Sequence, residues 1–136
     1  MKVKFFIILL LSLLISGCYD YREINDLAIV SAIGIDKNEN EYKVIAQIVN
    51  TQKSQNKSSD FIIYSSNDKS IQTAYNKITN EASKKLYVNH LNIIVISEEV
   101  AKDGISNILD IISRDSDFRA EVPIIISKTT SEELLK

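Results

Sequence analysis

The sequence predicts an α+β domain in which a mixed β-sheet is flanked by two or three helices. Short runs of β-branched and apolar residues alternate with a period of two, whereas other segments place apolar residues three or four positions apart. The chain has 136 residues, of which 45% are hydrophobic and 25% charged, as in ordinary globular proteins. A chain of this length is expected to form one domain around its own core.

Three strands are expected in the first half of this domain. Residues 27–36 alternate bulky and small apolar residues, so both faces are largely apolar and the strand is expected at the centre of the sheet. The polar turn 37–41 leads into a second run at 42–50, and together they predict a hairpin. The polar stretch 51–60 is expected to be a solvated loop, and residues 61–65 form a third, shorter strand.

The middle of the chain predicts a helix followed by a strand and a second helix. Between residues 70 and 86, apolar side chains fall on one stripe with helical spacing. Residues 91–96 are rich in β-branched residues and are expected to form a buried strand. Ser97 can cap the next helix, in which Glu98 and Glu99 suit the positive end of the helix dipole.

The last part of the chain predicts a helix, a strand and one helical turn. Gly104 is expected to break the preceding helix, after which Ile105, Ile108, Leu109 and Ile112 supply the apolar face of its continuation. Residues 122–127 form a strand with Pro123 near its start, where a missing donor is tolerated. Thr130 or Ser131 caps a final turn that stops at residue 136. Because isolated helices need roughly twelve residues to be stable, we expect a longer protein to continue beyond this point.

The first 17 residues have the features of a signal peptide of the lipoprotein type. Lys2 and Lys4 precede an apolar run at 5–15, and Ser16-Gly17 supplies two small residues before Cys18, which is the only cysteine. We expect cleavage between Gly17 and Cys18. The Cys18 thiol would then be the first mature side chain, and it is readily alkylated to a diacylglyceryl thioether.

Two alternatives to lipidation are open. A transmembrane anchor would need roughly twenty apolar residues, and the run has eleven. Cys18 could instead be an incidental free thiol, although the small residues before it disfavour this. Because two acyl chains hold a protein on a bilayer durably, the mature chain is expected on the extracytoplasmic face of a membrane. Residues 18–26 are expected to form a membrane-proximal tether, and residues 27–136 the domain.

The charge of the mature chain argues against nucleic acid as a partner. Residues 1–17 contain two of the 16 basic residues and none of the 18 acidic ones, so the mature net charge is about −4. Nucleic-acid binding requires a basic stripe, and the sequence has none. Once Cys18 is acylated, disulfide bonds cannot stabilise the fold.

Residues 17–36, GCYDYREINDLAIVSAIGID, resemble the opening of the Ger(x)C family, the lipoprotein C subunit of spore germinant receptors. The resembling positions are Cys18, Tyr19, Asp20, Arg22, Glu23, Ile24, Gly34, Ile35 and Asp36. Further similarity to the family pattern falls on Tyr87, Val88, Asn89, His90, Glu98, Glu99, Ala101, Gly104, Ile105, Asp110 and Arg114. Tyr19 stands where the family usually has Trp. Family proteins are near three times this length, so the chain is similar to their N-terminal domain.

This resemblance implies a function that composition and periodicity do not. It implies a C subunit on the outer face of the inner spore membrane, joined there to two integral membrane subunits in a receptor that detects small nutrients and starts germination. Arg22, Glu23 and Ile24 are candidates for contact with those subunits, since charges and apolar residues are interleaved close to the anchor. The alternative is that this stretch is only a solvated tether.

His90, Asp110 and Arg114 are expected to have structural roles. A hydrolase would have to use His90, the sole histidine, but no Gly-x-Ser-x-Gly elbow and no phosphate-binding loop accompany it. One histidine and one acylated cysteine cannot form a usual zinc site, so no metal or cofactor is expected. Asp110 and Arg114 are spaced to form an ion pair on a helix, but we favour the alternative that Arg114 ties the helix to the loop 115–119.

The sequence therefore leaves three classes of function open. The first, which we favour, is a non-enzymatic receptor subunit or scaffold. The second is an extracytoplasmic lipoprotein that binds a small solute directly, which would require a concave apolar pocket. The third is a membrane-tethered hydrolase, which would require a serine within reach of His90.

Overall fold

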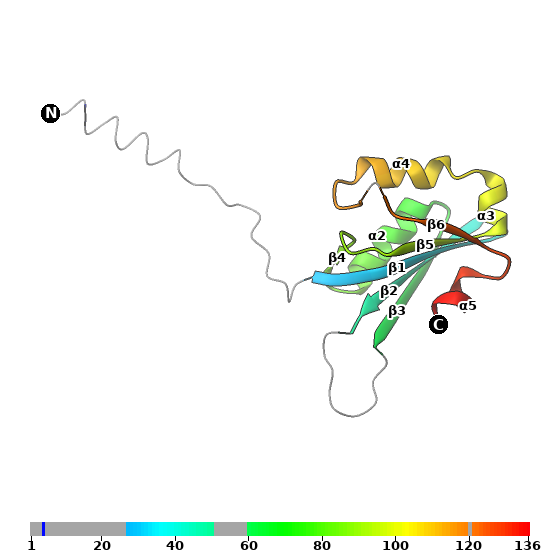
Figure 1. The fold of residues 1–136 in the computed structure, drawn as a ribbon, viewed down its shortest axis with the longest axis horizontal. Coiled ribbons are helices and arrows are strands. Elements are labelled where there is room, and N and C mark those ends of the chain that lie inside the picture. Colours follow the sequence, from blue (N-terminus) through cyan, green and yellow to red (C-terminus); the bar gives the residue numbers. More distant parts are fainter. Residues whose placement is uncertain (1–3, 5–26, 51–59, 120) are drawn as a thin grey trace.

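The computed structural model describes residue 4 and residues 27–50, 60–119 and 121–136. In these ranges six strands form one mixed sheet (Figure 1). The elements, in chain order, are β1 (Leu27–Asn38), β2 (Glu41–Val49), β3 (Phe61–Asp68), α2 (Ile71–Glu81), β4 (Lys85–Tyr87), β5 (Ile93–Ser97), α3 (Glu98–Asp103), α4 (Ser106–Arg114), β6 (Ile124–Ser127) and α5 (Ser131–Leu135). The predicted α+β class with a mixed sheet is confirmed.

The strand β1 lies at the centre of the sheet, as its two apolar faces predict. The strand order is β3-β2-β1-β5-β6, and the short strand β4 pairs with the first residues of β1. β1 and β2 form the expected antiparallel hairpin, in which Glu39 adopts a left-handed φ of 49° in the turn. β5 pairs with β1 in parallel, and β6 pairs with β5 in parallel.

The helices α2 and α4 lie together on one face of the sheet (Figure 1). They bury apolar side chains of their own, among them Ile78 and Ile108, against the strands. The strand residues beneath them are Val30, Ile33, Ile35, Val44, Ala46, Ile48, Ile94 and Ile96. Complete burial of one such aliphatic side chain contributes about 1.5–3 kcal/mol, so this layer is the main core of the domain.

The helix expected at 70–86 is shorter than predicted. α2 ends at Glu81, Ser83 adopts a left-handed φ of 52°, and Lys85–Tyr87 forms β4. The helical prediction for residues 82–86 is therefore wrong. Leu86 is buried, and as a strand residue it pairs with Ala28 of β1. Backbone pairing with the central strand thus replaces the last helical turn.

The predicted capping role of Ser97 is confirmed, since its hydroxyl accepts a hydrogen bond from the Val100 N–H at 3.4 Å. At the start of α2, the Ser70 hydroxyl accepts a hydrogen bond from the Thr73 N–H at 3.1 Å in the same way. Gly104 separates α3 from α4 with a φ of 98°, a conformation that L side chains rarely adopt.

The helix α5 packs on the opposite face of the sheet, which is covered by little else in the described part of the chain. The Asp36 carboxylate, only 4% exposed, accepts hydrogen bonds from the Ser131 N–H at 2.7 Å and the Glu132 N–H at 3.3 Å. The Gln47 amide donates to the Leu135 carbonyl at 3.0 Å. These tertiary contacts explain how a helix of five residues is ordered, since its own length would not suffice.

Gly34 leaves the space in which α5 sits. A Cβ atom at this position would lie 2.5 Å from the Ser131 Oγ and 2.9 Å from the Leu135 Cδ1, which is too close for either neighbour to remain in place. The Lys43 ammonium also forms an ion pair with Glu132 at 2.6 Å, and this contact holds the pKa of the Glu132 carboxyl below its ordinary value. Gly34 and Asp36 of the Gly-Ile-Asp sequence therefore both serve to dock α5.

Substitution Asp36→Ala is expected to destabilise the domain by about 1–3 kcal/mol, because it leaves the buried Ser131 N–H without an acceptor. Urea unfolding followed by circular dichroism measures this difference. Asp110→Ala removes an exposed carboxylate from α4 and is the control, with an expected change within about 0.5 kcal/mol. Equal unfolding midpoints for the two variants would contradict the proposed role of Asp36.

Candidate functional site

The residues with the strongest sequence signals lie outside the described ranges. They are Gly17 and Cys18 at the expected cleavage site, and Arg22, Glu23 and Ile24 in the expected tether. The tether precedes Leu27, the first residue of β1. The end of the sheet at which β1 begins is therefore the part of the domain next to the expected anchor.

Strand pairing brings the ends of four strands together here. β1 begins at Leu27, which pairs with Lys85 of β4. β2 runs antiparallel to β1 and ends at Val49, which pairs with Phe61 at the start of β3. We call the surface formed at this end by Leu27, Phe61, Ile62, Lys84 and Lys85 the tether-end surface.

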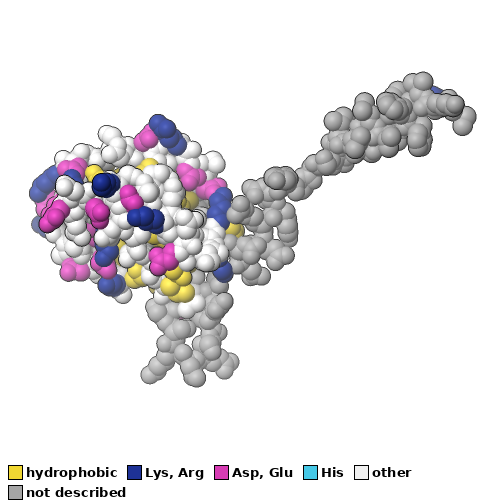
Figure 2. Space-filling view, turned by 180° about the vertical axis from the view of Figure 1, so that it is seen from behind, with side chains coloured by type: hydrophobic (Ala, Val, Ile, Leu, Met, Phe, Trp, Pro, Cys, Tyr) yellow, Lys and Arg dark blue, Asp and Glu magenta, His cyan; other side chains and the backbone are white. Residues whose placement is uncertain are grey.

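Two large apolar side chains are exposed on the tether-end surface. Phe61 is 40% and Ile62 is 42% exposed, and as consecutive strand residues they point to opposite faces of the sheet. β3 is an edge strand, so fewer neighbours cover them than would cover a central strand. Figure 2 shows hydrophobic side chains gathered on the lower part of the domain, whereas charged side chains are spread over the rest of that face.

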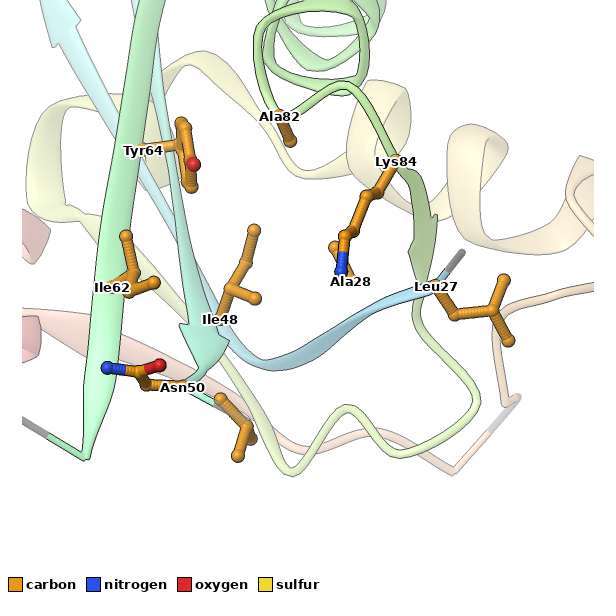
Figure 3. A pocket seen from close by; sticks show the side chains of 9 residues that line it. Leu27, Ala28, Ile48, Asn50, Ile62, Tyr64, Ala82 and Lys84 are labelled. Atoms are coloured by element: carbon orange, nitrogen blue, oxygen red, sulfur yellow. The ribbon is translucent and has the colours of Figure 1, made fainter. Parts of the chain in front are cut away.

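A shallow cleft of about 210 Å³ opens beside this surface (Figure 3). Ile62 and Tyr64 extend from β3 toward Ile48 of β2, and the Lys84 side chain extends toward Ala28. The complete lining is Leu27, Ala28, Ile48, Val49, Asn50, Ile62, Tyr64, Ala82 and Lys84. Ligand pockets usually measure about 300–1,000 Å³, so the cleft suits a single apolar side chain better than an enclosed small molecule.

His90 lies in the loop between β4 and β5 and is exposed. Its ring centroid lies 5.7 Å from that of Tyr87, with the two rings tilted by 54°. In the described ranges no hydrogen bond joins His90 to a serine, and no group of three or more His, Cys, Asp or Glu residues is placed to hold a metal ion. The contact that the structure shows for His90 is thus a ring contact with Tyr87 at the surface.

Asp110 and Arg114 face each other on α4. The Arg114 Nε lies 2.8 Å from the Asp110 Oδ1, and both side chains are largely exposed, at 79% and 55% respectively. The loop that follows α4 is held by different contacts, which the sequence did not reveal. Lys85 forms an ion pair with Asp117 at 2.6 Å, and the ring of Phe118 lies 6.2 Å from that of Tyr75. Burial raises the pKa of the Tyr75 phenol well above its ordinary value.

None of the helices in the described part of the chain is both long enough and apolar enough to cross a bilayer.

Comparison with known proteins relates the chain to spore germination. The family model described as the spore germination protein N-terminal domain matches residues 20–136. Spore germination protein KC of Bacillus subtilis (strain 168) is 34% identical over 142 residues, covering 96% of this chain and 35% of the relative. Spore germination proteins A3 and B3 of the same organism are each 25% identical, over 98% and 85% of this chain and over 38% and 32% of their own lengths.

The chain therefore spans about a third of the length of these relatives. No solved structure matches it at a significant level. The resemblance to the Ger(x)C family that residues 17–36 suggest is confirmed by the family match over the domain.

The pair Asp110–Arg114 is expected to couple weakly. In a double-mutant cycle with Asp110→Ala and Arg114→Ala, the coupling free energy should be about 0.3–0.5 kcal/mol, as is typical of exposed pairs four residues apart on a helix. Urea unfolding of the four proteins measures it. A coupling above about 1.5 kcal/mol would contradict a simple surface pair and require a further partner for one of the two residues.

Proposed function

The chain belongs to the family of the spore germination protein N-terminal domain, and we propose that it is a lipid-anchored, non-enzymatic subunit of a nutrient germinant receptor. In this proposal the domain assembles with integral membrane subunits, and the assembly is required for germination. The observation that carries the proposal is the family match over residues 20–136, together with relatives that are themselves named spore germination proteins.

The proposed anchor is a diacylglyceryl group on Cys18. Its support is the order of the first 18 residues: two lysines, an apolar run too short to span a bilayer, two small residues and then the sole cysteine. In this proposal the signal sequence directs the mature chain to the extracytoplasmic face, and the resemblance to the Ger(x)C family supports the inner spore membrane. Residues 19–26 would extend no more than about 30 Å, which keeps the domain close to the lipid.

The absence of catalysis is part of the same proposal. His90 would be needed by any histidine-dependent hydrolase, and its neighbour is the ring of Tyr87. The relatives bear names that refer to germination and to no reaction. Binding to other subunits is therefore the activity we assign, and Arg22, Glu23 and Ile24 are the residues we propose for the contact.

The alternative is an extracytoplasmic lipoprotein that binds a small solute directly. The cleft beside Tyr64 is the feature that favours it. Its volume of about 210 Å³ is below the usual range, and few convergent polar groups line it. A larger hollow of about 500 Å³ at the other end of the sheet is lined by polar and charged side chains rather than by an apolar wall. We therefore rank direct solute binding second.

Substitution Cys18→Ala is expected to move the protein from the membrane fraction to the soluble fraction, because it removes the only thiol that can carry the lipid. Ultracentrifugation of spore lysates followed by immunoblotting measures the distribution. Ser113→Ala, at an exposed position of α4, is the control and should stay with the membranes. Continued sedimentation of the Cys18→Ala protein would refute the anchor.

Substitution Arg22→Glu is expected to abolish assembly with the multi-span subunits while membrane retention stays unchanged, because it reverses a charge next to the anchor without touching the lipid. Co-purification of the subunits from detergent-solubilised spore membranes measures assembly. The matched control is Arg114→Glu, which reverses an exposed charge on α4. If Arg22→Glu leaves assembly intact, residues 22–24 are only a solvated tether.

A further inference from the structure

We propose that the tether-end surface docks on the headgroup region of an anionic lipid bilayer, so that the domain is held in one orientation on the membrane. This inference rests on the proposed lipid anchor, which brings the surface within reach of the bilayer. The occupant we assign to the surface is lipid. A protein partner at the same place is one of the outcomes that the experiment below distinguishes.

The first argument is the position of the chain entry. Residues 19–26 join Cys18 to Leu27, and they can span about 30 Å at most. Leu27 pairs with Lys85, and Phe61 lies at the same end of the sheet across β2. A bilayer that holds Cys18 therefore lies within about 30 Å of this end of the domain.

The second argument is the exposure of Phe61 and Ile62. Both side chains are large and apolar, and each is about 40% exposed at the start of β3. Because the two point to opposite faces of an edge strand, a flat surface laid against the strand end contacts both at once. The boundary between headgroups and acyl chains accepts apolar side chains of this kind.

The third argument is the distribution of charge between the two ends of the sheet. At the tether end, residues 27–30, 48–50, 60–63 and 84–87 contain the basic pair Lys84 and Lys85 and one acidic residue, Asp60. At the opposite end, residues 36–43, 66–69, 97–103 and 127–130 contain seven acidic and five basic residues. They are Asp36, Glu39, Glu41, Asp68, Glu98, Glu99 and Asp103, against Lys37, Lys43, Lys69, Lys102 and Lys128.

An anionic membrane discriminates between these two ends. Lysines near the surface are attracted to it and carboxylates are repelled, over a distance of about one Debye length. The basic pair lies beside the exposed apolar residues. Attraction of the lysines to anionic lipid and burial of the apolar side chains therefore both favour the orientation in which the tether end faces the membrane. Lys85 also contacts Asp117, and Lys84 is therefore the lysine on which the test relies.

The composition of the chain permits a direct test. The sequence contains no tryptophan and only one cysteine, so a single introduced tryptophan is a unique reporter and Cys18 is a unique coupling site. The mature protein, residues 18–136, is coupled through Cys18 to a maleimide lipid in vesicles made of equal parts phosphatidylglycerol and brominated phosphatidylcholine. The reporter is Phe61→Trp. The control is Ile126→Trp in β6, which is 57% exposed and pairs with Ile96 at the opposite end of β5.

We expect the lipid bromines to quench Phe61→Trp several-fold more than Ile126→Trp, because interfacial apolar side chains lie about 5–10 Å inside the headgroup boundary. Adding Lys84→Glu should reduce the quenching of Phe61→Trp, and so should replacing phosphatidylglycerol with phosphatidylcholine. Circular dichroism checks that each variant is folded, and Ile62→Trp replaces Phe61→Trp if the latter is not.

Equal quenching of the two reporters, or none at either, overturns the lipid assignment and leaves the surface for a protein partner. Because the coupling is chemical, this result does not depend on whether cells acylate Cys18. A failure of the anchor proposal would appear in the fractionation of Cys18→Ala, and a failure of the docking proposal would appear only in the vesicles.

Discussion

The central strand β1 must be buried on both faces, and the rest of the domain is arranged to meet that constraint. One face is covered by α2 and α4, which bring their own apolar stripes. The other is covered by α5, a helix of five residues that depends on the Asp36 carboxylate for its first turn and on Gly34 for its space. Both residues belong to β1, so the strand that α5 covers also provides the contacts that hold α5 in place.

The same strand decides which end of the sheet receives the chain from the expected anchor. β1 pairs with β2 on one side and with β4 and β5 on the other, so its first residue is surrounded by the ends of the neighbouring strands. Entry of the chain, exposed apolar residues and a basic pair therefore occur together at one end. The opposite end gathers carboxylates around the β1–β2 turn and the start of α3. In our proposal, this difference between the two ends of the sheet suits a domain that is held next to a membrane and next to the integral membrane subunits.

Local patterns predicted most of the elements, and long-range contacts decided the rest. The alternation in residues 27–36 and the capping by Ser97 have their effects within a few residues, and those predictions hold. The stripe that includes Leu86 satisfies a helix and a strand equally, and pairing with a segment more than fifty residues away selected the strand. The contact between Asp36 and Ser131 joins residues 95 positions apart, so no local sequence pattern could predict it. The tether-end surface depends likewise on register across three strands, whereas the expected lipidation of Cys18 rests on consecutive residues alone and stays a prediction.

Anchorage at Cys18 is the premise on which the orientation and the assembly both depend, and the mass of the native protein tests it most directly. Intact mass spectrometry of material extracted from spore membranes should show a chain that begins at Cys18 and carries a diacylglyceryl group, because cleavage after Gly17 and alkylation of the thiol belong to one process. A chain that retains residues 1–17 and has no acyl mass would contradict the account.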